Sequence, residues 1–154
     1  MNLAEFRKNL RYLERIIEKQ RETGADCCGV TLTQCHAILA IGNANNQTIS
    51  DLTKRLDLDK STVSRTINSL VKKDIVKRSP DSKDRRYLLL NLTQKGKKTF
   101  AEINDYANQK YNEIFSYIPK EKHQQILESF SFFVRALAKV EKEEKDNCGR
   151  YSNV

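Results

Sequence analysis

The chain has 154 residues, of which 38% are hydrophobic and 31% charged. This is enough for one compact domain, or for a domain with helical extensions that completes its core by dimerising. No apolar run approaches the roughly 20 residues of a membrane span, and the N-terminus lacks the apolar block of a signal peptide, so we expect a cytoplasmic protein with no membrane contact. The net charge is +8, and the whole excess lies in residues 48–98, where fourteen Lys and Arg oppose six Asp. This concentration predicts a polyanionic partner, and the plausible one is nucleic acid.

The first two predicted helices cover residues 3–21 and 32–41. In the first, apolar residues recur every three or four positions, as on an amphipathic helix, and Gly24 ends it. Thr31 and Gln34 fit a capping box at the start of the second. Its expected inward face carries Leu32, Cys35, Leu39 and Ala40.

Residues 48–73 predict two further helices joined by a tight turn at Leu58 and Asp59. Ser50 or Thr48 caps the first, and Asp59 is a good N-cap for the second. The apolar residues expected to be buried are Leu52 and Leu56 in the first helix and Val63, Ile67, Leu70 and Val71 in the second. The other face of the second helix is polar, rich in hydrogen-bond donors and free of acidic residues, which suits contact with a polyanion.

Two short strands, residues 75–78 and 87–92, flank a polar loop that ends in charged residues. A helix–turn–helix followed by such a hairpin is a winged helix–turn–helix, so the predicted fold class is mainly α with a small β-hairpin wing. Amphipathic helices are expected over residues 95–117 and 119–140, followed by a frayed tail. The expected buried residues of the last helix are Ile126, Leu127, Phe130, Phe133, Val134, Leu137 and Val140.

Three motifs stand in a fixed order: "DKSTVSR" in the second helix of the pair, Asp84-Arg85-Arg86 in the hairpin loop, and "LTQKG" over residues 92–96. In this combination the chain resembles the MarR family of bacterial and archaeal transcriptional regulators over nearly its whole length. The resemblance implies a single domain over residues 1–154, with dimerisation helices at 1–30 and 99–145, a winged helix–turn–helix DNA-binding lobe at 31–98 and a flexible tail at 146–154. The chain departs from the family at Asp74, where Gly is common, but Asp adopts the left-handed conformation at modest cost.

The resemblance also implies a homodimer on a pseudo-palindromic operator in double-stranded DNA, with two recognition helices in major grooves roughly 34 Å apart. Arg65 is the best candidate for bidentate contact with guanine, the alternative being contact with phosphate alone. The other candidate residues of the recognition helix are Ser61, Thr62, Ser64 and Asn68, which reach base edges or phosphates, and Lys60 and Lys72, which contact phosphates.

In the hairpin loop, Asp84 is placed to hold Arg86 by a charge-assisted hydrogen bond and aim it. The family resemblance directs this arginine into the minor groove, where narrow A·T-rich stretches attract it. Lys83 and Arg85 are expected to add phosphate contacts. The alternative is that Asp84 and Arg86 form an ordinary surface ion pair.

Cys27, Cys28 and Cys35 lie with His36 within ten residues. One interpretation is that the three thiolates bind a soft metal or metalloid ion as cofactor or effector. A second is redox or electrophile sensing, in which Cys35 is oxidised near a helix N-terminus and Cys27 or Cys28 resolves it as a disulfide. A third is that the cysteines are structural and the effector is another small molecule. The sequence leaves these three open.

No pattern in the chain favours an enzyme. His36 and His123 have no Ser or Asp arrangement beside them, and Cys35 and His36 point about 100° apart on a helix. We therefore expect a transcriptional regulator, with repression as the mode that the resemblance implies. The alternative is an architectural DNA-binding protein that responds to no ligand, and an effector-dependent loss of operator affinity distinguishes the two.

Overall fold

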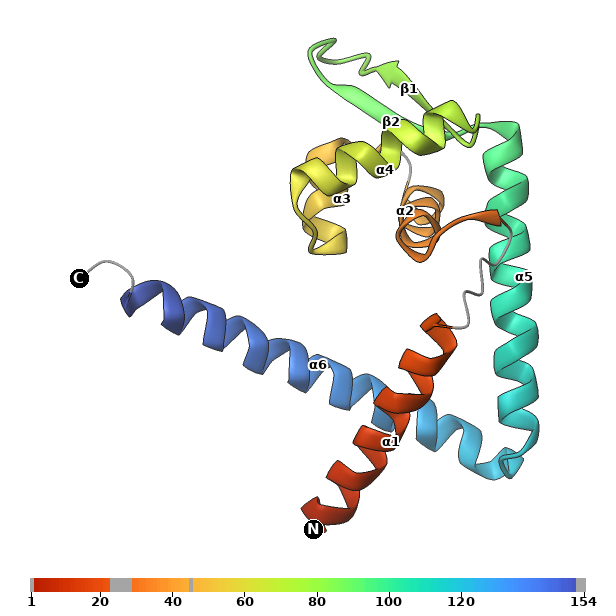
Figure 1. Cartoon of the computed structure of the whole chain (residues 1–154), viewed down its shortest axis with the longest axis vertical. Helices are drawn as coiled ribbons and strands as arrows, with labels where there is room; N and C mark the ends of the chain where they lie inside the picture. The colour runs from red at the N-terminus through yellow and green to blue at the C-terminus, as the bar shows by residue number, and fades with distance from the viewer. Residues whose placement is uncertain (1, 23–28, 45, 152–154) are drawn as a thin grey trace. The chain divides into compact units, whose positions relative to one another are not determined.

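The computed structural model describes residues 2–22, 29–44 and 46–151 (Figure 1). The helices and strands in these ranges are α1 (Leu3–Glu22), α2 (Leu32–Asn43), α3 (Ile49–Leu56), α4 (Lys60–Lys72), β1 (Val76–Pro80), β2 (Leu88–Leu92), α5 (Gln94–Ser116) and α6 (Lys120–Tyr151). The chain forms two units, residues 1–106 and 107–154. The predicted class, mainly α with a small β-hairpin, is confirmed. None of the helices in the described ranges combines the length and apolar character needed to cross a bilayer.

Capping residues set the starts of α2 and α3. Thr31 Oγ1 accepts a hydrogen bond from the Gln34 N–H, and Gln34 Oε1 accepts one from the Thr31 N–H, both at 3.3 Å. Thr48, rather than Ser50, caps α3 in the same reciprocal way with Asp51. These two capping boxes satisfy N–H groups that a helix N-terminus leaves without partners. The predicted start of α2 is therefore confirmed, and the alternative at the start of α3 is resolved.

The turn between α3 and α4 depends on two aspartates. Asp57 ends α3 in the left-handed conformation, at φ 49°, and its N–H donates to the Thr53 carbonyl oxygen. Asp59 then caps α4, with its side chain accepting a hydrogen bond from the Thr62 N–H. The left-handed residue is thus one position before the turn residues that the sequence indicates.

The core of the first unit is formed by residues of α2, α3, α4 and the hairpin, together with Val30 and with Ile103 of α5; Figure 1 shows the arrangement of these elements. Its largest fully buried side chains are Ile38, Ile41, Leu52, Ile67, Leu70, Leu90, Val63 and Val76. Burial of one side of α4 holds the opposite, polar side of that helix in solvent. The predicted burial of Leu52 and of three apolar residues of α4 is confirmed.

In the winged helix–turn–helix part, two residues predicted to be buried are exposed: Leu32 by 50% and Val71 by 37%. Because α2 has apolar residues on several sides, its sequence alone does not define an inward face. Packing against α3, α4 and β2 buries Gln34, Ala37, Ile38, Ala40 and Ile41. Cys35 and Leu39 are half-buried beside the core.

The hairpin pairs β1 and β2 antiparallel, with Val76 opposite Leu92 and Pro80 opposite Leu88. The Leu90 N–H also donates to the Gln47 carbonyl oxygen at 2.7 Å, which joins the segment before α3 to the sheet. Both strands begin one residue later than predicted, and β1 extends to Pro80. Proline is tolerated at this strand end because it lacks only the N–H donor.

A close approach between α5 and the end of α4 explains the glycine of the "LTQKG" motif. Asp74 is left-handed, at φ 57°, as expected at the position where the resembled family commonly has Gly. The Thr93 N–H donates to the Ile75 carbonyl oxygen at 3.0 Å. A Cβ on Gly96 would lie 2.0 Å from that same oxygen, so only glycine fits there.

The long helices expose their apolar residues within one chain. In α1, Leu3 is 49% and Phe6 45% exposed, and in α6, Phe130 is 58% and Leu137 56% exposed. Of the α6 residues expected to be buried, Phe133 is half-buried and the others are exposed in the single chain, as expected if the stripe is a dimer interface. The helix also continues beyond the predicted end, through Tyr151, so that the expected tail begins as helix.

Candidate nucleic-acid interface

The polar side of α4 is the candidate DNA-contacting surface, which we call the reading face; its residues are Lys60, Ser61, Thr62, Ser64, Arg65, Asn68 and Lys72. Lys60, Ser61, Arg65, Asn68 and Lys72 are exposed, and Thr62 and Ser64 are half-exposed. Val63, Ile67 and Leu70 on the other side are buried, and this burial orients the helix. All the α4 residues that the sequence proposed are thus at least half-exposed, on the sides of the helix away from the core.

The N-terminal turn of α4 is organised by Asp59. Its carboxylate accepts hydrogen bonds from the Ser61 hydroxyl and from the Thr62 N–H. The Ser61 and Thr62 hydrogen bonds hold the pKa of Asp59 well below its ordinary value. Asp59 is therefore ionised at neutral pH, as suits a carboxylate at a helix N-terminus.

Arg65 lies along its own helix. Its Nη2 donates to Ser61 Oγ at 3.3 Å and to Thr62 Oγ1 at 3.5 Å, and its Nε donates to the Ser61 carbonyl oxygen at 3.4 Å. These are long, weak bonds on an exposed surface, and they leave the two N–H donors of Nη1 uncommitted within the described residues. A side chain held in this way can exchange its intrahelical contacts for an acceptor on a ligand.

Asn68 has a partner that the sequence reasoning missed. Arg78 in β1 donates from Nη2 to Asn68 Oδ1 at 2.6 Å. Strand alternation places Arg78 on the same face of β1 as the buried Val76, which packs inward next to α4. That alternation is the signal from which this residue could have been found.

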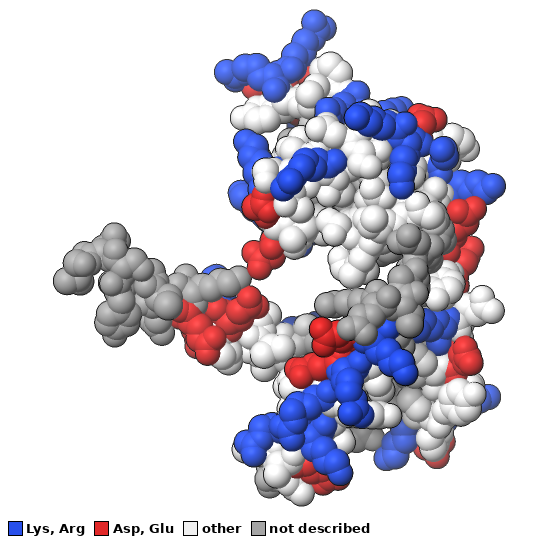
Figure 2. Space-filling model, viewed as in Figure 1, with Lys and Arg blue, Asp and Glu red and all other residues white. Residues whose placement is uncertain are grey.

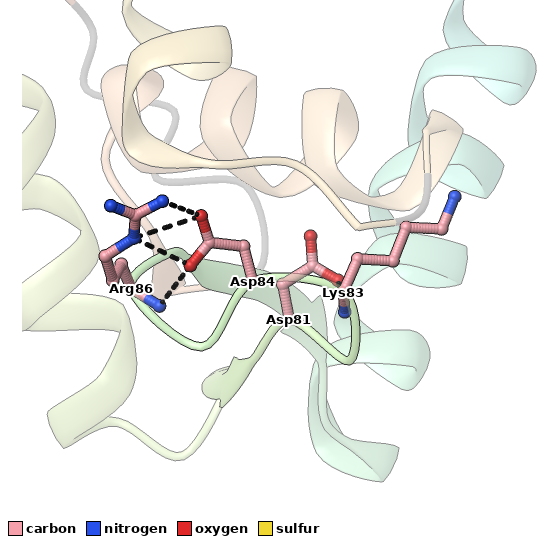
Figure 3. Close-up of polar contacts among 4 residues, drawn as sticks. All are labelled: Asp81, Lys83, Asp84 and Arg86. Atoms are coloured by element: carbon pink, nitrogen blue, oxygen red, sulfur yellow. Dashed lines mark hydrogen bonds and ion pairs between the residues drawn. The ribbon is translucent and has the colours of Figure 1, made fainter.

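The wing is formed by β1, β2 and residues 81–87. Its loop carries Arg86, whose guanidinium is hydrogen-bonded to Asp84 (Figure 3). Arg86 donates from Nη2 to Asp84 Oδ2 at 2.7 Å and from Nε to both carboxylate oxygens at 3.0 and 3.1 Å. The Arg86 side-chain hydrogen bond, followed by its backbone N–H, lowers the pKa of Asp84, and the same contact raises the pKa of Arg86. Asp84 thus holds the Nε and Nη2 edge of the guanidinium. The Arg86 side chain is still 88% exposed, so its other edge is accessible.

The remaining wing residues complete the turn. The Lys83 N–H donates to Asp81 Oδ1 at 3.0 Å, which shapes the loop before Asp84. Lys83 and Arg85 are exposed. On the face shown in Figure 2, Lys and Arg side chains gather over the part of the first unit that carries the wing. The predicted concentration of basic residues is thus presented on a surface.

A polar junction centred on the buried Gln34 connects α4 to the start of α2. Gln34 is 8% exposed, and its Nε2 donates to Ser69 Oγ at 3.0 Å. Lys73 Nζ donates to Gln34 Oε1 and to the Gly29 carbonyl oxygen, both at 3.2 Å. Gln34 therefore has two roles: it belongs to the capping box of α2, and its side chain is hydrogen-bonded to Ser69 of α4. The sequence around Gln34 predicts only the first role.

A family model for the MarR family matches residues 29–86, from three residues before α2 to Arg86 of the wing. The HTH-type transcriptional regulator SarZ of Staphylococcus epidermidis is 30% identical over 106 residues, which are 69% of this chain and 70% of that protein. The chain belongs to the MarR family. It is a transcriptional regulator that binds DNA, and the MarR-family proteins that it matches are regulators rather than enzymes.

Two solved MarR-type structures share the fold. FabT of Streptococcus pneumoniae, in complex with DNA, is 22% identical with a TM-score of 0.71, over 90% of this chain and 96% of that chain. MarR of Staphylococcus aureus, in complex with salicylate and kanamycin, is 18% identical with a TM-score of 0.74, over 88% of this chain and 92% of that chain. The winged helix–turn–helix expected from the sequence is confirmed.

Of the three cysteines between residues 27 and 35, the structure describes only Cys35. Cys27 and Cys28 lie outside the described residues. Cys35 is half-buried beside the core, and His36, its neighbour in α2, is exposed. Across the described part of the chain, no three His, Cys, Asp or Glu side chains come together as a metal site.

A cavity of about 430 Å³ lies in the first unit, between the end of α2, the outer face of the hairpin and the start of α5. It is lined by Ile41, Gly42, Lys77, Ser79, Asn91, Leu92, Lys97 and Phe100. Two ammonium groups thus stand beside apolar and aromatic side chains. This combination suits a small anion with an apolar body.

Proposed function

We propose that this MarR-family regulator binds a pseudo-palindromic operator as a homodimer in the cytoplasm, represses transcription there and is released by an effector. One observation carries the proposal: the exposed, donor-rich face of α4 stands in the same unit as a wing arginine braced by Asp84. A recognition helix and a wing presented together suit a major groove and its neighbouring minor groove. FabT, in complex with DNA, shares this fold.

Arg65 is proposed to read a base edge. Its guanidinium is exposed, and its present hydrogen bonds, at 3.3 to 3.5 Å, are weak enough to be exchanged for the O6 and N7 acceptors of a guanine. Ser61, Thr62 and Ser64 are short side chains that reach base edges or phosphates. Lys60 and Lys72 are proposed to contact phosphates, because an ammonium on a flexible stem places charge without defining a base.

Arg86 is proposed to enter the minor groove. Asp84 holds the inner edge of its guanidinium by two side-chain nitrogens and so reduces the number of directions that the side chain samples. Lys83 and Arg85, both exposed beside it, are proposed to contact phosphates. This assignment predicts a preference for A·T-rich flanks, where a narrow groove concentrates negative potential.

The homodimer is proposed from the exposed apolar faces of α1, α5 and α6. Apolar residues of α6 such as Ile126, Phe130 and Leu137 recur on one helical face and are between 39% and 58% exposed in the single chain. Contiguous apolar surface of this kind is typical of an interface, and a second copy would cover it on both chains at once. Two reading faces held together would then meet two half-sites.

Phe130→Asp tests the dimer, with Phe132→Asp as a matched control. Phe132 is 70% exposed and lies about 200° around the helix from Phe130, off the apolar stripe. Light scattering at micromolar concentration should show dimers for wild type and Phe132→Asp, and monomers for Phe130→Asp. A wild-type monomer with native helicity would rule out this dimer.

The effector is proposed to act near the start of α2. A change at Cys27, Cys28 or Cys35, by oxidation or by a soft metal or metalloid ion, would be transmitted to α4 through Gln34, which joins α2 to Ser69 and Lys73. The competing interpretation, structural cysteines and a different small molecule, has a candidate site in the 430 Å³ cavity between Lys77 and Lys97. MarR of Staphylococcus aureus was solved in complex with salicylate, a small aromatic anion.

Binding-site selection from a randomised duplex library tests the function itself. We expect a two-fold symmetric motif and an affinity that falls steeply with salt. Titrations of the selected DNA by wild type and Cys35→Ser, with reductant, mild peroxide, a trivalent arsenical or salicylate, then distinguish the effectors. Loss of affinity in peroxide or arsenical for the wild type alone supports the thiol mechanism. Constant affinity in every condition favours the alternative function, an architectural DNA-binding protein.

A further inference from the structure

The bond between Arg78 and Asn68 fixes which way an amide on the reading face is turned. Arg78 Nη2 and the Asn68 side chain are 2.6 Å apart. A guanidinium has only N–H donors, so the atom that faces it must be the carbonyl oxygen of the amide. The NH2 group of Asn68 is therefore turned away from Arg78, and both residues remain exposed.

This orientation bears on what Asn68 reads. An asparagine recognises adenine through two simultaneous bonds, in which its oxygen accepts from N6 and its nitrogen donates to N7. When Arg78 occupies the oxygen, the amide offers chiefly its two N–H donors, and the guanidinium beside it adds more donors. Such a pair suits an acceptor-rich edge, and guanine, with O6 and N7, is the base that has two acceptors in the major groove.

We propose that Arg78 is a specificity-determining positioning residue, which holds Asn68 as a hydrogen-bond donor and so makes the Asn68 contact prefer guanine to adenine. The inference rests on the proposed DNA-reading role of α4 and adds a residue from the wing strand to it. Asn68 lies three positions after Arg65 on the same helical face, so the two residues address neighbouring base steps. The strand thereby sets part of the helix's base preference.

The experiment is a selection of randomised duplexes by wild type, Asn68→Ala, Arg78→Met and Arg78→Lys. Asn68→Ala identifies the base position that depends on Asn68, because the preference at that position alone is lost. Wild type should prefer guanine there. In Arg78→Met the amide is released and the preference should move toward adenine by ~5- to 150-fold, the range of one bidentate contact. Arg78→Lys keeps one donor to the amide oxygen and should retain most of the guanine preference.

Arg85→Met is the matched control, since it also removes one exposed arginine charge from the same hairpin. It should lower affinity for all sequences and leave the base preferences as they are. Circular dichroism and thermal unfolding of each variant confirm that the wing and α4 are folded in the proteins compared.

Three results would overturn the inference. If Arg78→Met lowers affinity for every sequence and leaves the Asn68 position unchanged, Arg78 is a phosphate contact. If wild type prefers adenine at that position, the amide is not held as a donor. If wild type selects no motif at all, the proposed function fails first, and the two failures are thereby distinguished.

Discussion

Replacing Gln34 by Ala should destabilise the DNA-binding lobe by removing the polar junction between α2 and α4. The substitution deletes three side-chain hydrogen bonds: to Ser69 Oγ, from the Thr31 N–H and from Lys73 Nζ. Each has a net value of ~0.5–1.5 kcal/mol. Because Thr31 and Lys73 are exposed, water replaces part of what they lose, and the bond to Ser69 dominates. We expect the free energy of unfolding to fall by about 2 kcal/mol, roughly a 30-fold change in the folded-to-unfolded ratio.

The assay is urea unfolding followed by circular dichroism at one fixed protein concentration, since the stability of a dimer depends on concentration. Gln94→Ala is the control, because Gln94 is an exposed glutamine at the start of α5 and its replacement should change the free energy by less than about 0.5 kcal/mol. In a DNA titration, Gln34→Ala should weaken binding to all sequences alike, since it moves the support of α4 and none of its base contacts. If Gln34→Ala were as stable as Gln94→Ala, the junction would not be a structural link.

Other substitutions separate the roles assigned to the interface. Arg65→Ala should cost ~1–3 kcal/mol at the operator and relax one base position, whereas Lys72→Ala should weaken all sequences and flatten the salt dependence; identical sequence profiles for the two would contradict these roles. Asp84→Asn should weaken the preference for A·T-rich flanks by releasing Arg86, and Arg86→Ala should abolish that preference in the same selection. The pKa of Asp84 is lowered in the folded protein, so its carboxylate is fully ionised and holds Arg86 at any pH above the ordinary pKa of Asp. The stronger preference of wild type for A·T-rich flanks, compared with Asp84→Asn, should therefore vanish as the pH falls through the lowered pKa. Gly96→Ala should destabilise the fold by ~1–3 kcal/mol or more, because its Cβ would meet the Ile75 carbonyl oxygen, and an unchanged urea midpoint would argue against that contact.

Local chemistry accounts for the features that could be predicted from the sequence. A capping box depends on residues three positions apart, so Thr31 and Gln34 predict the start of α2 without any tertiary information. The aspartate that caps α4, the left-handed Asp74 and the Asp84–Arg86 pair are likewise interactions between near neighbours. The side of α4 that stays polar followed from periodicity, because three of its apolar residues lie on one helical face.

Features that depend on partners distant in the chain had to come from the tertiary structure. The inward face of α2 is one, since apolar residues surround that helix and only its packing on α3, α4 and β2 selects Ile38 and Ile41 over Leu32. The second function of Gln34 is another, because Ser69 is thirty-five positions away. Arg78 and Asn68 are ten positions apart on different elements, and only the pairing of the hairpin and its packing beside α4 bring their side chains within 2.6 Å. Sequence patterns predict interactions within one helix or strand. The contacts that orient the reading face join different helices and strands, so they depend on how these elements pack together.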